Sequence, residues 1–241
     1  MMAFLVDDLL DFAQLNAGKF RKTVKKFELK EAMEEIIDVQ KDKASMSGIQ
    51  LSCEYIPQSA ENKKITSLFS ENKNKKLLIS RAAESSEEED ASVDLSFNSS
   101  RKPFVPKTPI MVETDRRRLQ QVILNIQSNA LKFTERTGKV TLYYSIYNLN
   151  EKCYLEVQVK DTGVGIQRKD KPKLFKLFGF VQSTEDMNTK GIGLGLVISK
   201  KIVENYGGEI GFKSKWKKGS TFGFRIQLEN VIDTEAILYE N

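Results

Sequence analysis

Three glycines spaced two residues apart directly precede an amphipathic helix in the second half of the chain. Gly191, Gly193 and Gly195 lie within residues 188–204, N-T-K-G-I-G-L-G-L-V-I-S-K-K-I-V-E. Glycine lets another group approach the main chain closely and adopts conformations that other residues avoid. Alternating glycines at a helix start expose successive backbone N–H groups, to which the helix dipole adds positive potential. The stretch predicts an anion site that suits a triphosphate, and a turn without ligand remains the alternative.

Two common phosphate-binding motifs are excluded for this stretch. The P-loop pattern G-x-x-x-x-G-K-[ST] is absent, and Leu196 stands where G-x-G-x-x-G requires its third glycine. The helix is predicted from about Leu194 to Tyr206, and Gly207-Gly208 ends it.

A second candidate motif lies on a helix predicted to begin after Thr114 or Asp115 as its N-cap. At about 100° per residue, Asn125, Asn129 and Lys132 share a narrow arc beside an apolar stripe. Amide oxygens suit a Mg²⁺ that bridges phosphates, and a lysine can neutralise a phosphate. A helix with polar residues at its boundary is the alternative. The predicted stripe consists of Leu119, Val122, Ile123, Ile126, Ala130 and Phe133.

A third motif, D-T-G-V-G-I, begins at Asp161 directly after a predicted strand. A carboxylate there can accept from an exocyclic amine, which distinguishes adenine from guanine, and the glycines allow close approach or positive φ. A plain turn is the alternative. Downstream, K-P-K-L-F-K-L-F-G-F carries Phe175, Phe178 and Phe180, which need cover from the core or a neighbouring surface.

Composition excludes several classes of function. The chain has 241 residues and no histidine, which removes Ser-His-Asp and Cys-His catalysis and most zinc sites. Cys53 and Cys153 fit no metal spacing, as expected in a reducing compartment. The net charge of +5 is scattered among acidic runs, so no nucleic-acid partner is predicted. No apolar run approaches the roughly 20 residues that span a bilayer, and no signal peptide is visible. We expect a cytoplasmic chain, whether or not a longer parent protein is membrane-anchored.

Residue patterns predict an α+β fold: a two-layer α/β sandwich with helices on one face of a mixed sheet. Hairpins are expected over 139–160 and 209–228. Met2, Leu5, Leu9 and Phe12 have the spacing of a coiled-coil seam, and a surface helix packed on its own domain is the alternative. The predicted segments are a helix at 1–19, a helix and a strand at 20–56, a disordered polar insertion at 57–108, the main domain at 109–230 and a tail at 231–241.

In combination, these motifs resemble the catalytic ATP-binding domain of sensor histidine kinases, in the Bergerat-type ATPase superfamily. Four sequence boxes match those of the family in order. The N box is L-Q-Q-V-I-L-N-I-Q-S-N-A-L-K-F-T, and the first glycine box is D-T-G-V-G-I. The phenylalanine box is L-F-K-L-F, and the second glycine box is G-I-G-L-G-L-V-I-S-K-K-I-V-E-N-Y-G-G-E-I. G-S-T-F-G-F matches the strand that usually follows. L-V-D-D-L-L-D-F-A-Q-L-N-A-G-K resembles the end of the dimerisation domain.

The resemblance implies roles for individual residues. Asn129, helped by Asn125, would hold Mg²⁺, Lys132 would contact a phosphate of ATP, and Asp161 would bind the adenine amino group. The glycines of the two glycine boxes would shape the pocket, the lid hinge and the phosphate-binding helix start. The remaining residues implied in ATP binding are Gly163, Gly165, Ile166, Phe178, Gly191, Ile192, Gly193, Leu194, Gly195, Leu196 and Thr221.

The chain also departs from the family. The phosphoacceptor histidine and its helix are missing, so the resemblance implies a histidine-bearing dimerisation helix in another chain or parent protein, a downstream response-regulator receiver domain and a homodimer as partners. Ile192 replaces the usual Ser or Thr, and Lys176-Leu177 replaces Glu-Pro. A non-catalytic nucleotide-binding or dimerisation module that regulates a kinase partner is the alternative function. Direct ATP hydrolysis is disfavoured, because the amide of Asn125 cannot act as a general base.

Overall fold

The computed structural model describes residues 21–57, 109–149, 152–177 and 193–231, and nearer the N-terminus Leu10, 12–15, Ala17 and Lys19. The predicted insertion at 57–108 lies outside the described residues except for its first residue, and the predicted tail lies outside them except for Val231. Phe178, Gly191 and Ile192 of the predicted site also lie outside them. The domain boundaries therefore stay predictions.

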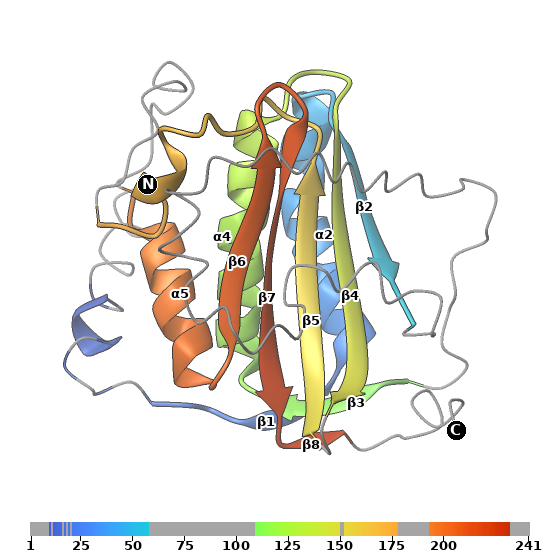
Figure 1. The fold of residues 1–241 in the computed structure, drawn as a ribbon. Coiled ribbons are helices and arrows are strands. Elements are labelled where there is room, and N and C mark those ends of the chain that lie inside the picture. Colours follow the sequence, from blue (N-terminus) through green and yellow to red (C-terminus); the bar gives the residue numbers. More distant parts are fainter. Residues whose placement is uncertain are drawn as a thin grey trace.

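A five-stranded mixed sheet forms one layer of the molecule (Figure 1). Its order is β2-β4-β5-β7-β6; β2 runs parallel to β4, and the other neighbours are antiparallel. Both predicted hairpins are confirmed, as β4–β5 and β6–β7. The strands are β2 (Gln50–Tyr55), β4 (Lys139–Leu149), β5 (Lys152–Asp161), β6 (Glu209–Lys215) and β7 (Gly219–Leu228).

Three helices cover one face of this sheet, with α4 between α5 and α2 (Figure 1). They are α2 (Leu29–Met46), α4 (Arg116–Phe133) and α5 (Gly195–Asn205), and a 3-10 turn, η2 (Lys171–Lys173), follows β5. The predicted α+β architecture is confirmed. A small antiparallel sheet of β1 (Lys25–Glu28), β3 (Met111–Thr114) and β8 (Asn230–Val231) was not predicted. No helix in the described part of the chain is long and apolar enough to cross a membrane.

Helix α4 forms the centre of the helical layer. Its N-cap is Asp115, one of the two predicted candidates, whose Oδ1 accepts the backbone N–H of Arg118 at 3.1 Å. The predicted buried stripe is confirmed except at Phe133, which is only half-buried, whereas Gln127 and Leu131 are buried. The buried sector is displaced toward Gln127 because α2 packs against that side of α4.

The N-terminal segment contacts the hydrophobic core where it is described. Leu15 is buried within the core, and Phe12 packs against it with its ring 5.7 Å from Lys201 Nζ. Phe12 therefore follows the alternative of a helix packed on its own domain. The coiled-coil interpretation of Met2, Leu5 and Leu9 lies outside the described residues.

Gln127 is a polar side chain in the core and gives a first testable prediction. It is fully buried, and neither its amide oxygen nor its amide nitrogen has a hydrogen-bond partner among the described residues. A buried polar group without a partner costs roughly 1–3 kcal/mol. We expect Gln127→Leu to raise the free energy of unfolding in urea by about 1 kcal/mol or more.

Gln120, two helical turns earlier on the same side of α4, provides the matched control. Its amide donates to the carbonyl oxygen of Ala32 at 3.3 Å and to Glu35 at 2.8 Å. Gln120→Leu should therefore leave the stability unchanged or lower it. Destabilisation by Gln127→Leu would show that the buried amide is satisfied in solution.

Candidate functional site

The site is built around Asp161, the last residue of β5. Its side chain is only 6% exposed, and its Oδ1 accepts two backbone N–H groups, from Gly163 at 2.9 Å and from Ser220 at 3.1 Å. Burial raises the pKa of this carboxyl group to about 6, and the two backbone hydrogen bonds oppose part of that rise. Because Oδ1 is held by the main chain, Oδ2 is the oxygen that can accept from a ligand.

The loop after Asp161 is fastened to the end of α4. The N–H of Val164 donates to the carbonyl oxygen of Phe133 at 3.1 Å. A Cβ atom at Gly163 would lie 2.2 Å from that same oxygen, so only glycine lets the loop come this close. The second and third sequence motifs, which are about 30 residues apart in the chain, therefore meet in space.

The same loop is fastened to the β6–β7 turn on its other side. Gly165 has φ +67°, and a Cβ atom there would lie 2.1 Å from the carbonyl oxygen of Lys215. The N–H of Ile166 donates to Ser214 Oγ at 2.8 Å, and the N–H of Lys217 donates to the carbonyl oxygen of Val164 at 2.7 Å. The loop is thus held between α4 and β6, with its backbone shape set by contacts at both ends.

Strand β7 contributes Ser220 to this neighbourhood and directs Thr221 away from it. Asp161 pairs with Ser220, whereas Thr221 pairs with Lys160. Because side chains alternate along a strand, Thr221 faces the side of the sheet opposite to Asp161. The register thus assigns to Ser220 the position that the sequence assigned to Thr221. Only Thr221 was predicted from G-S-T-F, because the pairing partners of neighbouring residues are not visible in a sequence.

Helix α5 meets α4 through Asn125. Its amide nitrogen donates to the carbonyl oxygen of Gly195 at 3.2 Å and lies 3.4 Å from the hydroxyl oxygen of the fully buried Ser199. A Cβ atom at position 195 would lie 2.9 Å from Asn125 Oδ1, so a side chain there would displace the Asn125 amide. The first and second sequence motifs are therefore in direct contact, and Ser199 is a participant that the sequence did not indicate.

The first turn of α5 is the part of the predicted anion site that the structure describes. Its N-cap, Leu194, makes no side-chain capping hydrogen bond, in contrast to Asp115 of α4. Gly193 precedes it with φ +75°, a conformation that favours glycine. Leu194 is buried and Leu196 packs against the core, so both leucines anchor the turn, and the backbone N–H groups are the parts suited to a ligand.

Asn129 and Lys132 lie half-buried on the arc of α4 that begins at Asn125. Burial lowers the pKa of the Lys132 ammonium group, and the positive charge of Lys43 on α2 lowers it further. Lys43 Nζ donates to Ser128 Oγ at 3.2 Å, so α2 brings a second cation to this part of α4. This second cation was not predicted, because the contact joins residues 85 positions apart.

The side chains present suit a magnesium ion that comes with a nucleotide. Among the described residues, no group of three or more cysteine, aspartate or glutamate side chains could hold a metal by itself. The amide oxygens of Asn125 and Asn129 are hard donors of the kind that Mg²⁺ accepts alongside phosphate oxygens and water. This set of donors therefore fits a metal that is also bound by phosphates better than a metal held by protein side chains alone.

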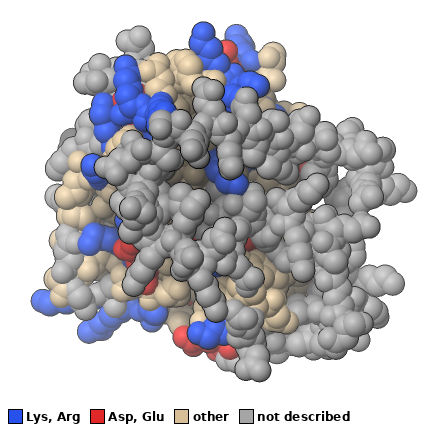
Figure 2. All heavy atoms as spheres, in the orientation of Figure 1, with Lys and Arg blue, Asp and Glu red and all other residues tan. Residues whose placement is uncertain are grey.

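Lysine and arginine side chains gather near the Asp161 end of the molecule. Figure 2 shows Lys and Arg side chains along its upper edge, over the β6–β7 turn and the loop that follows β5. A Cβ atom at Gly219 in that turn would lie 2.1 Å from the carbonyl oxygen of Asp161, so the turn adjoins the site. This charge favours an anionic ligand. The exposed cations of these two segments are Arg168, Lys169, Lys176, Lys215, Lys217 and Lys218.

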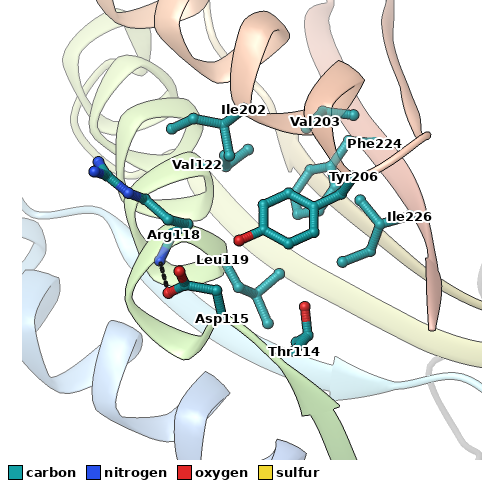
Figure 3. A pocket seen from close by; sticks show the side chains of 10 residues that line it. All are labelled: Thr114, Asp115, Arg118, Leu119, Val122, Ile202, Val203, Tyr206, Phe224 and Ile226. Carbon is teal, nitrogen blue, oxygen red and sulfur yellow. Dashed lines mark hydrogen bonds between the residues drawn. The ribbon is translucent and has the colours of Figure 1, made fainter. Parts of the chain in front are cut away.

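A small pocket lies at the other end of α4 and contains none of the predicted site residues (Figure 3). It is lined by Val122, Ile202 and Phe224 in its apolar part and by Asp115 and Tyr206 among its polar residues. The linker before β1 is bonded there, because the N–H of Thr23 donates to Asp115 Oδ2 at 2.8 Å. The pocket therefore lies beside the point where this linker is attached.

Comparison with known proteins identifies the class to which this fold and site belong. Residues 114–230 match the family described as "Histidine kinase-, DNA gyrase B-, and HSP90-like ATPase". They form an ATPase domain of this family, homologous to the ATP-binding domains of sensor histidine kinases.

The matched relatives are longer than this chain. Over 225 residues it is 30% identical to the signal transduction histidine-protein kinase BarA of Escherichia coli strain K12, a match that covers 93% of this chain and 19% of BarA. Over 123 residues it is 41% identical to the sensor histidine kinase RcsC of the same organism, covering 51% of this chain and 12% of RcsC. The chain therefore spans about a fifth of BarA and less of RcsC.

Solved structures share the fold. The full-length kinase ShkA in complex with AMPPNP superposes with a TM-score of 0.62 at 20% identity, over 96% of this chain and 37% of ShkA. The histidine kinase ThkA in complex with the response regulator TrrA superposes with a TM-score of 0.53 at 19% identity, over 94% of this chain and 48% of the matched chain. At these identities the likeness shows the fold alone. It confirms the predicted ATP-binding fold of histidine kinases.

Proposed function

We propose that this chain binds Mg–ATP between the Asp161 loop and the first turn of α5, and that it transfers the γ-phosphate to a histidine supplied from elsewhere. The observation that carries the proposal is the convergence of the three sequence motifs on α4. The carbonyl oxygen of Phe133 accepts the N–H of Val164 in the Asp161 loop, and the amide of Asn125 donates to the carbonyl oxygen of Gly195 at the start of α5. The ShkA complex with AMPPNP, an ATP analogue, supports nucleotide binding by this fold.

Each part of the proposed site has a separate task. Asp161 Oδ2 accepts the adenine amino group, while the first turn of α5 and Lys132 stabilise the phosphates. Asn129, with Asn125 beside it, provides amide oxygens to Mg²⁺, which when bound neutralises charge on the phosphates. Transfer moves the γ-phosphoryl group from the β-phosphate oxygen to an imidazole nitrogen, and ADP leaves. This chain has no histidine, so the acceptor is a dimerisation helix in another chain or parent protein.

The phosphoryl group on that histidine would then pass to a receiver domain. The ThkA complex with a response regulator supports this partnership for the fold. In this proposal the chain's own contribution ends at the first transfer, because its sequence contains no histidine to accept the phosphoryl group.

Label transfer tests the proposal. A separate helical hairpin that carries the acceptor histidine is incubated with this chain and ATP labelled at the γ-phosphate. We expect label on the hairpin that is stable in alkali and labile in acid. Asn129→Ala should abolish the transfer, whereas Asn205→Ala, at the exposed end of α5, should not. Binding of ATP without transfer to any histidine hairpin would favour the alternative of a non-catalytic nucleotide-binding module.

The pKa of Asp161 predicts how adenine binding depends on pH. Burial raises this pKa to about 6, so the ionised carboxylate predominates above pH 6 and the neutral acid below it. The acid proton would occupy Oδ2 and face the adenine amino group, so that two hydrogen-bond donors would oppose each other. We expect the affinity for adenosine, which has no phosphate to titrate, to fall by up to about tenfold per pH unit below pH 6. A competition assay between pH 5 and pH 8 measures this affinity. Constant affinity across this range would exclude Asp161 as the adenine acceptor.

A further inference from the structure

We infer that Lys43 is a second phosphate-binding lysine of the proposed ATP site and that it acts on the outermost phosphate. The inference rests on the proposed function and extends it, because Lys43 belongs to none of the matching sequence motifs. It lies in the last turn of α2, on the other side of α4 from α5.

The position of Lys43 is fixed by a contact between two helices. Its Nζ donates to Ser128 Oγ at 3.2 Å, and Ser128 lies one helical turn before Lys132, on the same side of α4. A serine hydroxyl accepts this hydrogen bond without neutralising the ammonium charge. The contact therefore holds the Lys43 charge beside the Asn129–Lys132 arc and leaves it available to an anion.

The electrostatics of Lys132 show that the two lysines influence each other. Burial is the main cause that lowers the pKa of Lys132, and the charge of Lys43 is the second. Two ammonium groups near one another repel, and the repulsion is relieved when an anion lies between or beside them. A phosphate is the anion that the rest of the site would bring to this position.

The order of the helices indicates which phosphate Lys43 contacts. Adenine would lie at Asp161, and the first turn of α5 lies on one side of α4. Lys132 stands on α4 itself, and Lys43 reaches α4 from α2 on its other side (Figure 1). A triphosphate that extends from α5 across α4 would meet Lys43 last. Lys43 therefore contributes to the affinity for ATP and little to the affinity for ADP.

Calorimetric titrations with ATP and with ADP, both with Mg²⁺, test this inference. We expect Lys43→Gln to weaken ATP binding by about three- to tenfold, the effect of one partly exposed charged contact, and ADP binding by less than twofold. Lys43→Arg, which keeps the charge, should retain most of the preference. The matched control is Lys41→Gln, an exposed lysine two residues earlier on α2, which should bind both nucleotides as the unaltered chain does.

The outcomes separate the inference from the proposed function. Absence of ATP binding by the unaltered chain would overturn both. ATP binding by the unaltered chain with the same ATP-to-ADP ratio in Lys43→Gln would overturn the inference alone. Equal weakening of ATP and ADP would also overturn it, because a purely structural role of Lys43 does not depend on the number of phosphates.

Discussion

Asp161→Asn is expected to weaken ATP binding by about 10- to 100-fold without unfolding the protein, because a hydrogen bond to a charged group is worth about 1.5–3 kcal/mol. The asparagine Oδ1 can still accept the N–H groups of Gly163 and Ser220. The other carboxylate oxygen is then replaced by an NH₂ group, which points a donor at the adenine amino group. Guanine presents a carbonyl oxygen in place of that amine. The preference for ATP over GTP should therefore fall more than the affinity for the triphosphate.

Calorimetry with ATP and GTP measures both effects, and a thermal melt checks the fold. Glu156→Gln is the matched control, because Glu156 is another buried carboxylate of β5 whose partners, Tyr147 and Gln158, lie outside the site. It should bind ATP as the unaltered chain does. If Asp161→Asn bound ATP with unchanged affinity and preference, adenine would have to be recognised by another group.

Gly165→Ala is expected to destabilise the protein by about 3 kcal/mol or more, which combines a strained positive φ with a steric clash. The new methyl group would lie 2.1 Å from the carbonyl oxygen of Lys215, and backbone on one side or the other must shift. Urea denaturation followed by circular dichroism measures the loss. Because the same loop carries Asp161, any folded protein that remains should also bind ATP more weakly.

Gly207→Ala separates the two causes. Gly207 ends α5 with φ +64°, and a Cβ atom there would meet nothing within 4 Å. This substitution introduces the same backbone strain without a clash, so it should cost about 1–2 kcal/mol. Equal losses of stability at the two positions would mean that the loop adjusts easily to a side chain at position 165 and is not held rigidly between α4 and β6.

The elements of the fold could be predicted because their signals are local. The helix that ends at Gly207 and the N-cap at Asp115 both follow from residues within a few positions of each other. The small sheet of β1, β3 and β8 has strands of two to four residues and was missed, since such short segments carry almost no periodicity. The parallel pairing of β2 with β4 likewise depends on contacts across the chain.

The candidate site was predictable as a set of motifs and less so as a set of contacts. The sequence indicated Asn125 and Gly195 separately, and the structure shows that they touch. Ser199, Ser214 and Ser220 were missed, because isolated serines carry no pattern until the register and helix packing are known. Lys43 was missed for the same reason. Thr221 was predicted where the register places Ser220, and in a strand a shift of one residue reverses the face.

The most direct test of the central claim is a calorimetric titration of the unaltered chain with ATP, with and without Mg²⁺. The proposed site predicts saturable binding of one ATP per chain, clearly tighter with Mg²⁺ than without it. Absence of binding under both conditions would contradict the claim, and binding indifferent to Mg²⁺ would contradict the role given to Asn125 and Asn129.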